Sequence, residues 1–310
     1  MKRVIPTTVA EALANAPELA VEAPLPGSGR TGELWQLLTT IAATDLGAAR
    51  AIEPHLDAIA ILHEAGADDL RTIGSTWGVF AAEGGEPLRF ANGVLDGTKQ
   101  WCSLADRLDA ALVTATLENG DRQLFAVDLR HAGIGVIEGA WHSRGLSEVP
   151  SGPVRFAAVP ATPVGGSGWY LSRPGFTWGG IGVAACWYGG AIGIARTVYA
   201  NAVNDFALAH LGAIDELLSC CRLALDDAAA LVDSGEANSI TAKRVRATVA
   251  RAAEEIIARA GHALGPAPLA LDAPHAKRVA DLGIYIRQHH AEKDQASLGR
   301  ALLDLEGAPW

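Results

Sequence analysis

The sequence has little positive charge, few cysteines and no targeting segment. Its 310 residues carry 25 Lys and Arg against 35 Asp and Glu, a formal net charge of −10. Because nucleic acids and anionic membranes attract basic surfaces, this balance argues against partners of either kind. The four cysteines show no C-x-x-C spacing, so reduced thiols and a cytoplasmic location are expected; they are Cys102, Cys186, Cys220 and Cys221.

Apolar runs are short. The opening residues MKRVIPTT lack the apolar core of a signal peptide, and no run is predicted to reach the length of a membrane span. Hydrophobic residues nevertheless make up 49% and charged residues 19%, which excludes a disordered chain and predicts a sizeable core. A chain of this length forms one large domain or two to three packed ones.

Familiar catalytic motifs are missing too: there is no G-x-S-x-G, no P-loop and no H-E-x-x-H. Residues 180–185, GIGVAA, match the G-x-G-x-x-A dinucleotide fingerprint. No apolar strand precedes them and no alternation of strands and helices follows, so a Rossmann site is not expected. Glycines continue through Gly189, Gly190 and Gly193 and indicate close approach of a helix to another helix or to a ligand.

Three textures follow one another along the chain. Apolar periodicity predicts helices at residues 8–20, from Thr31, and from about Ala48 to Gly66. Between residues 78 and 163, short apolar runs separated by Gly-Gly, Asn-Gly and Asp-Gly pairs predict a small antiparallel sheet or barrel. After residue 168 the helical period returns and predicts a bundle of four to five helices.

Two short segments carry candidate chemistry. Trp101 and Ser103 follow a glycine turn, and an indole beside small polar residues can stack on a flat ring or fill a core. His289 and His290 stand at a predicted helix end, followed by Glu292. Such a group can bind a metal, serve as an acid–base pair, or face solvent where the helix dipole favours imidazolium. The residues alone leave these alternatives open.

Several segments together resemble the acyl-CoA dehydrogenase superfamily of flavoproteins in order and spacing. The likeness spans most of residues 74–310. The segments are LDGTKQWCSLAD at 95–106, DAALVTA at 109–115, WHSRGLSEVPSGPVRF at 141–156, GVAACWYGGA at 182–191 and DLGIYI at 281–286.

The resemblance implies an α+β fold in three parts. These are a shortened N-terminal helical part over residues 1–73, a middle antiparallel β-barrel domain over 74–165 and a C-terminal four-helix bundle over 166–310. It also implies FAD bound between the barrel and the bundle of a neighbouring subunit, and therefore a homodimer or homotetramer. Trp101 and Ser103 fall on the flavin-contacting positions of the family.

Three further cofactor-binding candidates stand where this chain departs from the family pattern. Trp77 lies in the segment that replaces an acidic, glycine-rich loop before the barrel. Arg173 is the nearest substitute for an arginine expected at the start of the first bundle helix, and Gly265 ends the altered Q-x-x-G-G-x-G turn.

The implied reaction is α,β-dehydrogenation of an acyl thioester, most simply an acyl-CoA. In the family a carboxylate takes the α-proton while flavin N5 takes hydride from the β-carbon. Here residues 287–292, RQHHAE, replace the usual Tyr-Glu-Gly-Thr segment, so His289, His290 and Glu292 are the candidate bases. An electron-transfer flavoprotein or a partner subunit is the implied electron acceptor, and no metal is expected. The alternatives are a flavin monooxygenase acting on a non-CoA substrate and a non-catalytic homologue that binds flavin or a partner.

Overall fold

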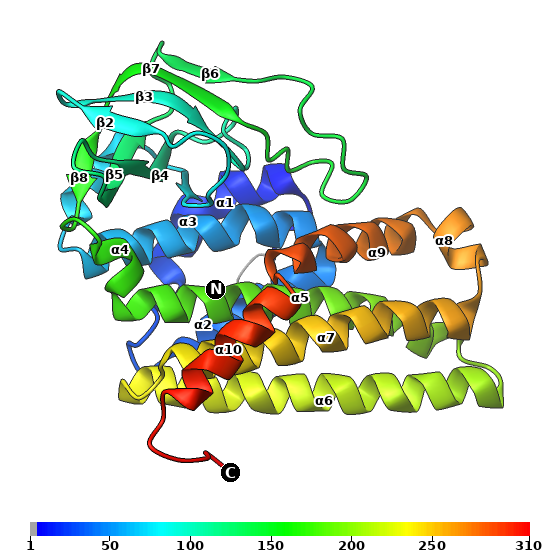
Figure 1. Cartoon of the computed structure of the whole chain (residues 1–310). Helices are drawn as coiled ribbons and strands as arrows, with labels where there is room; N and C mark the ends of the chain where they lie inside the picture. Colours follow the sequence, from blue (N-terminus) through cyan, green and yellow to red (C-terminus); the bar gives the residue numbers. More distant parts are fainter. Residues whose placement is uncertain (1–4) are drawn as a thin grey trace.

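The computed structural model describes residues 5–310. Residues 1–4, part of the segment used above to argue against a signal peptide, lie outside the described residues. Helices, a curled sheet and a second set of helices follow one another along the chain (Figure 1). This arrangement confirms the predicted α+β fold class.

The N-terminal helices form a layer beneath the sheet. They are α1 (Val9–Glu22), α2 (Thr31–Thr44), α3 (Leu46–Glu64) and a final 3₁₀ turn, η1 (Asp68–Ile73). The Thr8 hydroxyl caps α1 by accepting from the Glu11 amide, and the Asp45 carboxylate caps α3 by accepting from the Ala48 amide. The helices therefore begin at side chains that satisfy free backbone amides.

The middle of the chain forms one eight-stranded sheet in the order β6-β7-β3-β2-β4-β5-β8, with β1 also beside β4. Strands β7 and β8 are separated only by Ala161, yet β7 pairs with β3 and β8 pairs with β5. The sheet must therefore curl round so that its two sides meet. The strands are β1 (Trp77–Phe80), β2 (Arg89–Ala91), β3 (Val94–Lys99), β4 (Ala110–Thr116), β5 (Arg122–Asp128), β6 (Ile134–Val136), β7 (Val154–Pro160) and β8 (Thr162–Val164).

Pairing in this sheet is not wholly antiparallel. Strands β1 and β2 both run parallel to β4, whereas the remaining pairs are antiparallel. Strand β1 follows the helical layer directly and reaches β4 without a hairpin, so turn signals along the sequence could not reveal this pairing.

The C-terminal helices surround α5. The elements are α4 (Trp169–Ser172), α5 (Pro174–Asn201), α6 (Asp205–Ser234), α7 (Ser239–Leu264), α8 (Ala267–Leu271), α9 (Ala273–Tyr285), η2 (Ile286–Gln288) and α10 (Glu292–Leu303). Helix α5 contacts α2, α3, α6, α7 and α9. By length and composition it could cross a membrane, which the sequence reading did not anticipate, but 72% of its most apolar window is buried inside the protein. It is the core helix of the bundle.

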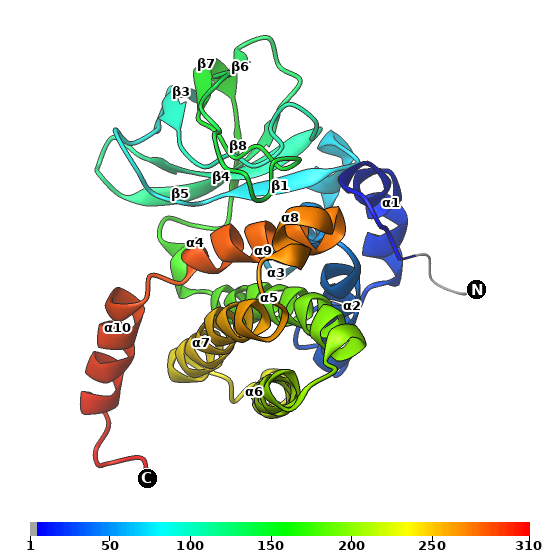
Figure 2. The ribbon, with the colours of Figure 1, turned by 90° about the vertical axis from the view of Figure 1, so that its right-hand side faces the viewer.

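The last helix lies apart from that core. Helix α10 buries none of its residues and contacts only the side of α7 (Figure 2). The sequence pattern located this helix, but the helix adds no layer to the bundle.

The glycines of α5 are used within the chain. A methyl group on Gly189 would collide with the Thr39 carbonyl oxygen in α2. One on Gly193 would lie 3.1 Å from the Ala43 carbonyl oxygen, closer than side-chain carbons normally approach. This stripe therefore packs α5 against α2 and is not a free face for a second copy.

We expect Gly189→Ala to lower the free energy of unfolding by about 1–3 kcal/mol, because the added methyl group must push α2 away. Gly212 in α6 is the matched control, since nothing lies within 4 Å of a methyl group there. Gly212→Ala should stabilise the protein by about 0.5–1 kcal/mol through helix propensity. Denaturant titration measures both, and equal effects would contradict the close α2–α5 contact.

Candidate functional site

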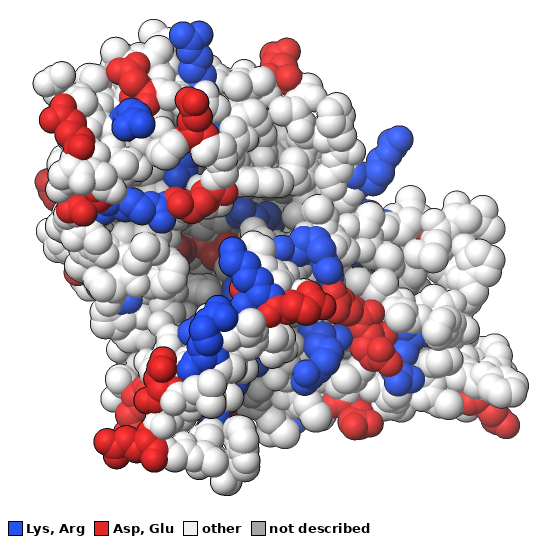
Figure 3. All heavy atoms as spheres, in the orientation of Figure 1, with Lys and Arg blue, Asp and Glu red and all other residues white. Residues whose placement is uncertain are grey.

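A hollow opens between the sheet and the helices below it, and acidic atoms are visible inside it (Figure 3). The charged side chains of α3 explain this. Arg50, Glu53, Asp57 and Glu64 are spaced by three, four and seven residues, so they share one face of the helix. That face contacts α5, where Gly179 allows Asp57 to approach: a methyl group there would lie 2.9 Å from the Asp57 Oδ1. The hollow is called the cleft below.

The sheet side of the cleft is the segment after β3. The Cys102 and Leu104 amides donate to the Gly152 and Pro150 carbonyls at 3.0 and 2.9 Å, which continues the pairing of β3 with β7. Trp101 is 57% exposed, so its ring is available to a ligand. Cys102, by contrast, is buried.

Ser103 connects the sheet to the helices. Its hydroxyl accepts a hydrogen bond from an Arg50 Nη2 at 3.0 Å and lies 2.7 Å from the Ser151 hydroxyl. The Arg50 guanidinium in turn lies 5.6 Å from the ring centre of Tyr285 in α9. A continuous set of contacts therefore crosses from the sheet to the bundle.

The bundle side is organised by Arg246 of α7. Its guanidinium lies 4.7 Å from the ring centre of Trp187, which meets the Tyr285 ring edge-on at 6.3 Å. Arg246 donates to the Gly180 carbonyl at 2.8 Å and to the Gln288 carbonyl at 3.0 Å. It thereby fixes the link between α9 and α10 against the first turns of α5.

Strained backbone gathers around this region. Six non-glycine residues in the described chain have positive φ, and four of them adjoin the segments just described: Trp101, Leu104, Leu146 and Ala291. Each such residue costs on the order of 1–3 kcal/mol and persists only where the surroundings hold it. Strain of this kind is common at ligand sites.

Three buried polar atoms of the region have no hydrogen-bond partner: Trp187 Nε1, Tyr285 Oη and His289 Nε2. Only the Cys186 thiol stands beside the Tyr285 hydroxyl. Because buried polar atoms in proteins are nearly always hydrogen-bonded, these are atoms that a bound ligand can satisfy.

The three candidate bases are placed differently. The His289 side chain is 9% exposed, 4.0 Å from the Asp294 carboxylate, and burial lowers its pKa while Asp294 opposes that shift. His290 is 63% exposed and stands 3.6 Å from the same carboxylate. Glu292 lies exposed in the first turn of α10. His289 alone of the three is buried beside Arg246.

The remaining candidates lie away from Trp101 and Ser103. Trp77 is 1% exposed, with its indole N–H donating to the Gly74 carbonyl, so its ring belongs to the core. Arg173 is buried in an ion pair with Glu64 at 2.6 Å, at the acidic end of the cleft. Gly265 ends α7 about five helical turns from Arg246.

Four residues of the site escaped the sequence reading: Arg50, Glu53, Arg246 and Tyr285. Glu53 is 8% exposed, and burial raises its pKa to about 7 although Arg50 opposes the shift. The available signal was the charged stripe of α3, which interrupts an otherwise apolar helix. A stripe of that kind on a single sequence also fits a solvated face.

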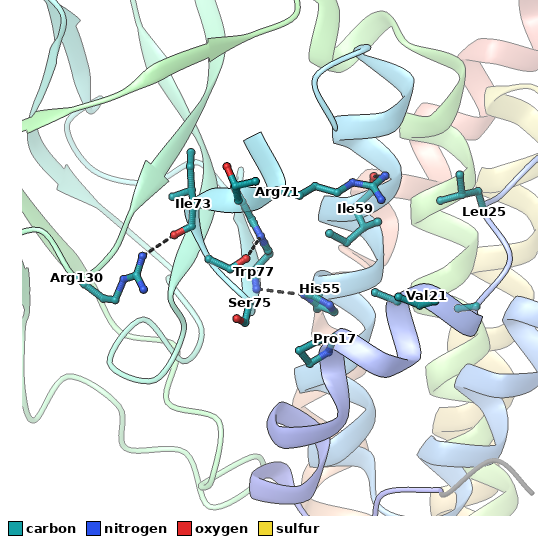
Figure 4. Close-up of a pocket in the computed structure, with 14 residues that line it drawn as sticks. Pro17, Val21, Leu25, His55, Ile59, Arg71, Ile73, Ser75, Trp77 and Arg130 are labelled. Carbon is teal, nitrogen blue, oxygen red and sulfur yellow. Dashed lines mark hydrogen bonds between the residues drawn. The ribbon is translucent and has the colours of Figure 1, made fainter. Parts of the chain in front are cut away.

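A second cavity, of about 810 Å³, lies on the opposite side of α3 (Figure 4). His55 and Trp77 lie at its centre, joined by a hydrogen bond from the Trp77 amide. Its two arginines contact the protein itself, Arg71 through Asp68 and Arg130 through the Ile73 carbonyl and Asp128. Within residues 5–310, no group of three or more acidic, histidine or cysteine side chains is arranged to hold a metal ion.

Comparison with known proteins identifies the fold. No family model and no curated protein sequence matches the chain. Among solved structures, butyryl-CoA dehydrogenase from Megasphaera elsdenii is 14% identical over 98% of this chain and 100% of its own, with a TM-score of 0.78. PigA with FAD and proline is 15% identical over 96% of this chain and 90% of its own (TM-score 0.80). TdsC from Paenibacillus sp. A11-2 with FMN and indole is 15% identical over 96% of this chain and 95% of its own (TM-score 0.76).

Identities this low establish the arrangement of helices and strands and leave the chemistry to be argued from the residues. The match covers nearly the whole of every chain compared, so it includes the helical layer, the sheet and the bundle together. The resemblance read from the sequence is confirmed at the level of structure: this chain has the acyl-CoA dehydrogenase fold.

Proposed function

We propose that the cleft binds a flavin and that the protein is a flavin-dependent oxidoreductase. The observation that carries this is the continuous contact from Ser103 through Arg50 to Tyr285, which places the exposed Trp101 ring and unpartnered buried donors around one cleft. Two structures of the same fold support it, since TdsC holds FMN and PigA holds FAD.

The residues suit a flat, heteroaromatic group. Trp101 offers a ring for stacking, and the Ser103 hydroxyl and the Tyr285 and Trp187 donors offer hydrogen bonds to a polar edge. FAD is the proposed flavin. Its adenosine half would reach a neighbouring copy, where Gly265 is the candidate contact. A flavin bound here would supply a two-electron oxidant.

The proposed reaction is dehydrogenation of an acyl thioester, with His289 as the base. Burial lowers the His289 pKa, so the imidazole is neutral at neutral pH and its Nε2 can accept the α-proton. Asp294, 4.0 Å away, would stabilise the imidazolium that results. His290 and Glu292 could serve only if the α9–α10 link turned inward, because both are exposed.

A second candidate is a flavin monooxygenase acting on a substrate without CoA. The likeness to TdsC with indole and the charged floor of the cleft favour it. Anaerobic addition of an acyl-CoA panel to the yellow protein separates the candidates. Bleaching of the flavin supports the dehydrogenase, a yellow protein that no thioester bleaches supports the monooxygenase, and a protein that takes up no FAD contradicts the flavin proposal.

We expect Trp101→Ala to weaken FAD binding by about 1–2 kcal/mol, or roughly 5–30-fold in Kd, because one face of the ring system loses its cover. Trp310→Ala is the control, since that indole is 90% exposed at the end of the chain. Fluorescence titration with FAD measures both. Equal affinities in the two variants would return Trp101 to a structural role.

We expect His289→Gln to slow flavin reduction by an acyl-CoA at pH 8 by about 100-fold or more, since general bases contribute rate factors of this size. His290→Gln should reduce at the parental rate. In the parent, reduction should rise with pH, with a midpoint below the ordinary histidine pKa of 6.5, and then level off, because the lowered pKa deprotonates His289 early. Stopped-flow measurements from pH 5 to 8 test this, and a parental rate in His289→Gln would place the base elsewhere.

We also propose self-association into a homodimer or homotetramer, with an electron-transfer flavoprotein or another partner subunit as electron acceptor. The turn between α5 and α6 exposes Tyr199, Val203 and Phe206 at 77%, 87% and 84%. Clustered exposed apolar side chains of this kind mark protein interfaces.

We therefore expect light scattering to give the mass of at least a dimer, and Phe206→Glu to shift it toward the monomer. Leu303→Glu in α10, where the leucine is 86% exposed but isolated, should leave the mass unchanged. A monomeric parent with FAD bound would contradict the assembly.

A further inference from the structure

Glu53 is a buried carboxylate without a partner of its own. Its side chain lies on the cleft face of α3 and the residue is 8% exposed. In the described part of the chain it makes no hydrogen bond or ion pair at contact distance. Burying a charged group without a partner costs several kcal/mol, so such groups are retained where something outside the protein pairs with them.

The groups around Glu53 do not fill this role. Arg50 donates to Ser103, and Arg246 donates to the Gly180 and Gln288 carbonyls, so both arginines are already engaged. The charged and titratable groups that face Glu53 are Arg50 and Asp57 on α3, Tyr170 on α4, Cys186 on α5, Arg246 on α7 and Tyr285 on α9.

A comparison along the same helix face sharpens the point. Glu64 accepts hydrogen bonds from Arg173 at 2.6 Å and from the Gly175 amide at 3.1 Å, so its charge ties α3 to the start of α5. Glu53 sits three turns earlier, deeper in the fold, and ties nothing. The first carboxylate is explained by structure and the second is not.

We propose that Glu53 binds a hydrogen-bond donor of the substrate, a hydroxyl or an amino group, at the floor of the cleft. The substrate class is therefore a polar-substituted molecule and not a plain hydrocarbon chain. This rests on the proposed function only in taking the cleft as the substrate site. An analogue without the donor would leave the carboxylate unpaired, and sites built to receive a donor reject such analogues strongly.

The first test needs no ligand. If Glu53 is retained for binding, Glu53→Gln and Glu53→Leu should raise the Tm by a few degrees, because they remove a buried, unpartnered charge. Glu64→Gln is the matched control and should lower the Tm, since it breaks the contacts with Arg173 and Gly175. A lower Tm in both Glu53 variants would assign Glu53 to the structure and overturn the proposal.

The gain should depend on pH with a defined sign. Burial raises the Glu53 pKa from 4.5 to about 7, so the folded protein holds an extra proton between these values. Its stability therefore falls as pH rises through this window. The Tm advantage of Glu53→Gln should accordingly be larger at pH 8 than at pH 5, and a larger advantage at pH 5 would contradict the burial of an unpartnered carboxylate.

The second test uses matched ligands and the flavin-loaded protein. Butyryl-CoA is compared with 4-hydroxybutyryl-CoA and 4-aminobutyryl-CoA, and indole with 1-methylindole, by the change in the flavin spectrum. The donor-bearing members should bind at least about tenfold more tightly, and Glu53→Leu should remove that advantage. A preference for the hydroxyl or the amino compound identifies the donor.

The outcomes separate the two proposals. Equal binding within every pair, or an advantage that survives in Glu53→Leu, overturns the role of Glu53. If only the indole pair binds, the thioester substrate fails while the indole pair still decides Glu53. If no flavin binds, the proposed function fails, and the Tm of the Glu53 variants decides whether that carboxylate is structural.

Discussion

The contact of α5 with its neighbours is the constraint on which the rest of the structure depends. Along α5, glycine stands wherever another element comes close: Gly175 against Glu64, Gly179 against Asp57, and Gly189 against the Thr39 carbonyl. Helices that lack side chains at their contact can approach until backbone and carboxylate touch. The first half of α5 therefore shapes the acidic floor of the cleft, and the second half fixes α2.

Charge is buried at the same contact. Arg173 and Glu64 pair at 2.6 Å, and the Arg173 guanidinium also lies 3.8 Å from Asp57, so one arginine serves two carboxylates. Desolvation raises the pKa of Asp57 and of Glu53, while the neighbouring arginines oppose it. A single apolar interior would have been easier to stabilise. The retention of these charges beside Trp101 and Ser103 is what favours a binding site here.

Much of the fold could be read from the sequence because it rests on local signals. Apolar periodicity located α1, α3 and the long bundle helices, and turn residues located the strands. The parallel pairing of β1 with β4 could not be read, since it joins segments more than thirty residues apart. Nor could the membrane-like length of α5, because only the surrounding helices account for its apolar surface.

The site was predicted less completely than the fold. Trp101, Ser103 and His289 lie in short motifs with their own local pattern, and the structure sets Ser103 and His289 at the two ends of one contact network. Glu53 and Arg246 belong to helices whose polar faces look solvated in sequence and are covered only by tertiary packing. Trp77 shows the converse, an aromatic residue that the core consumes.

The exposed position of α10 has a consequence for motion. Because this helix buries none of its residues, undocking it forfeits little apolar burial compared with any movement of α5. The two hydrogen bonds of Arg246 hold the adjoining link from the other side. Local unfolding should thus begin at the C-terminal helix and stop at Arg246, so amide hydrogens of α10 exchange with solvent long before those of the central helix.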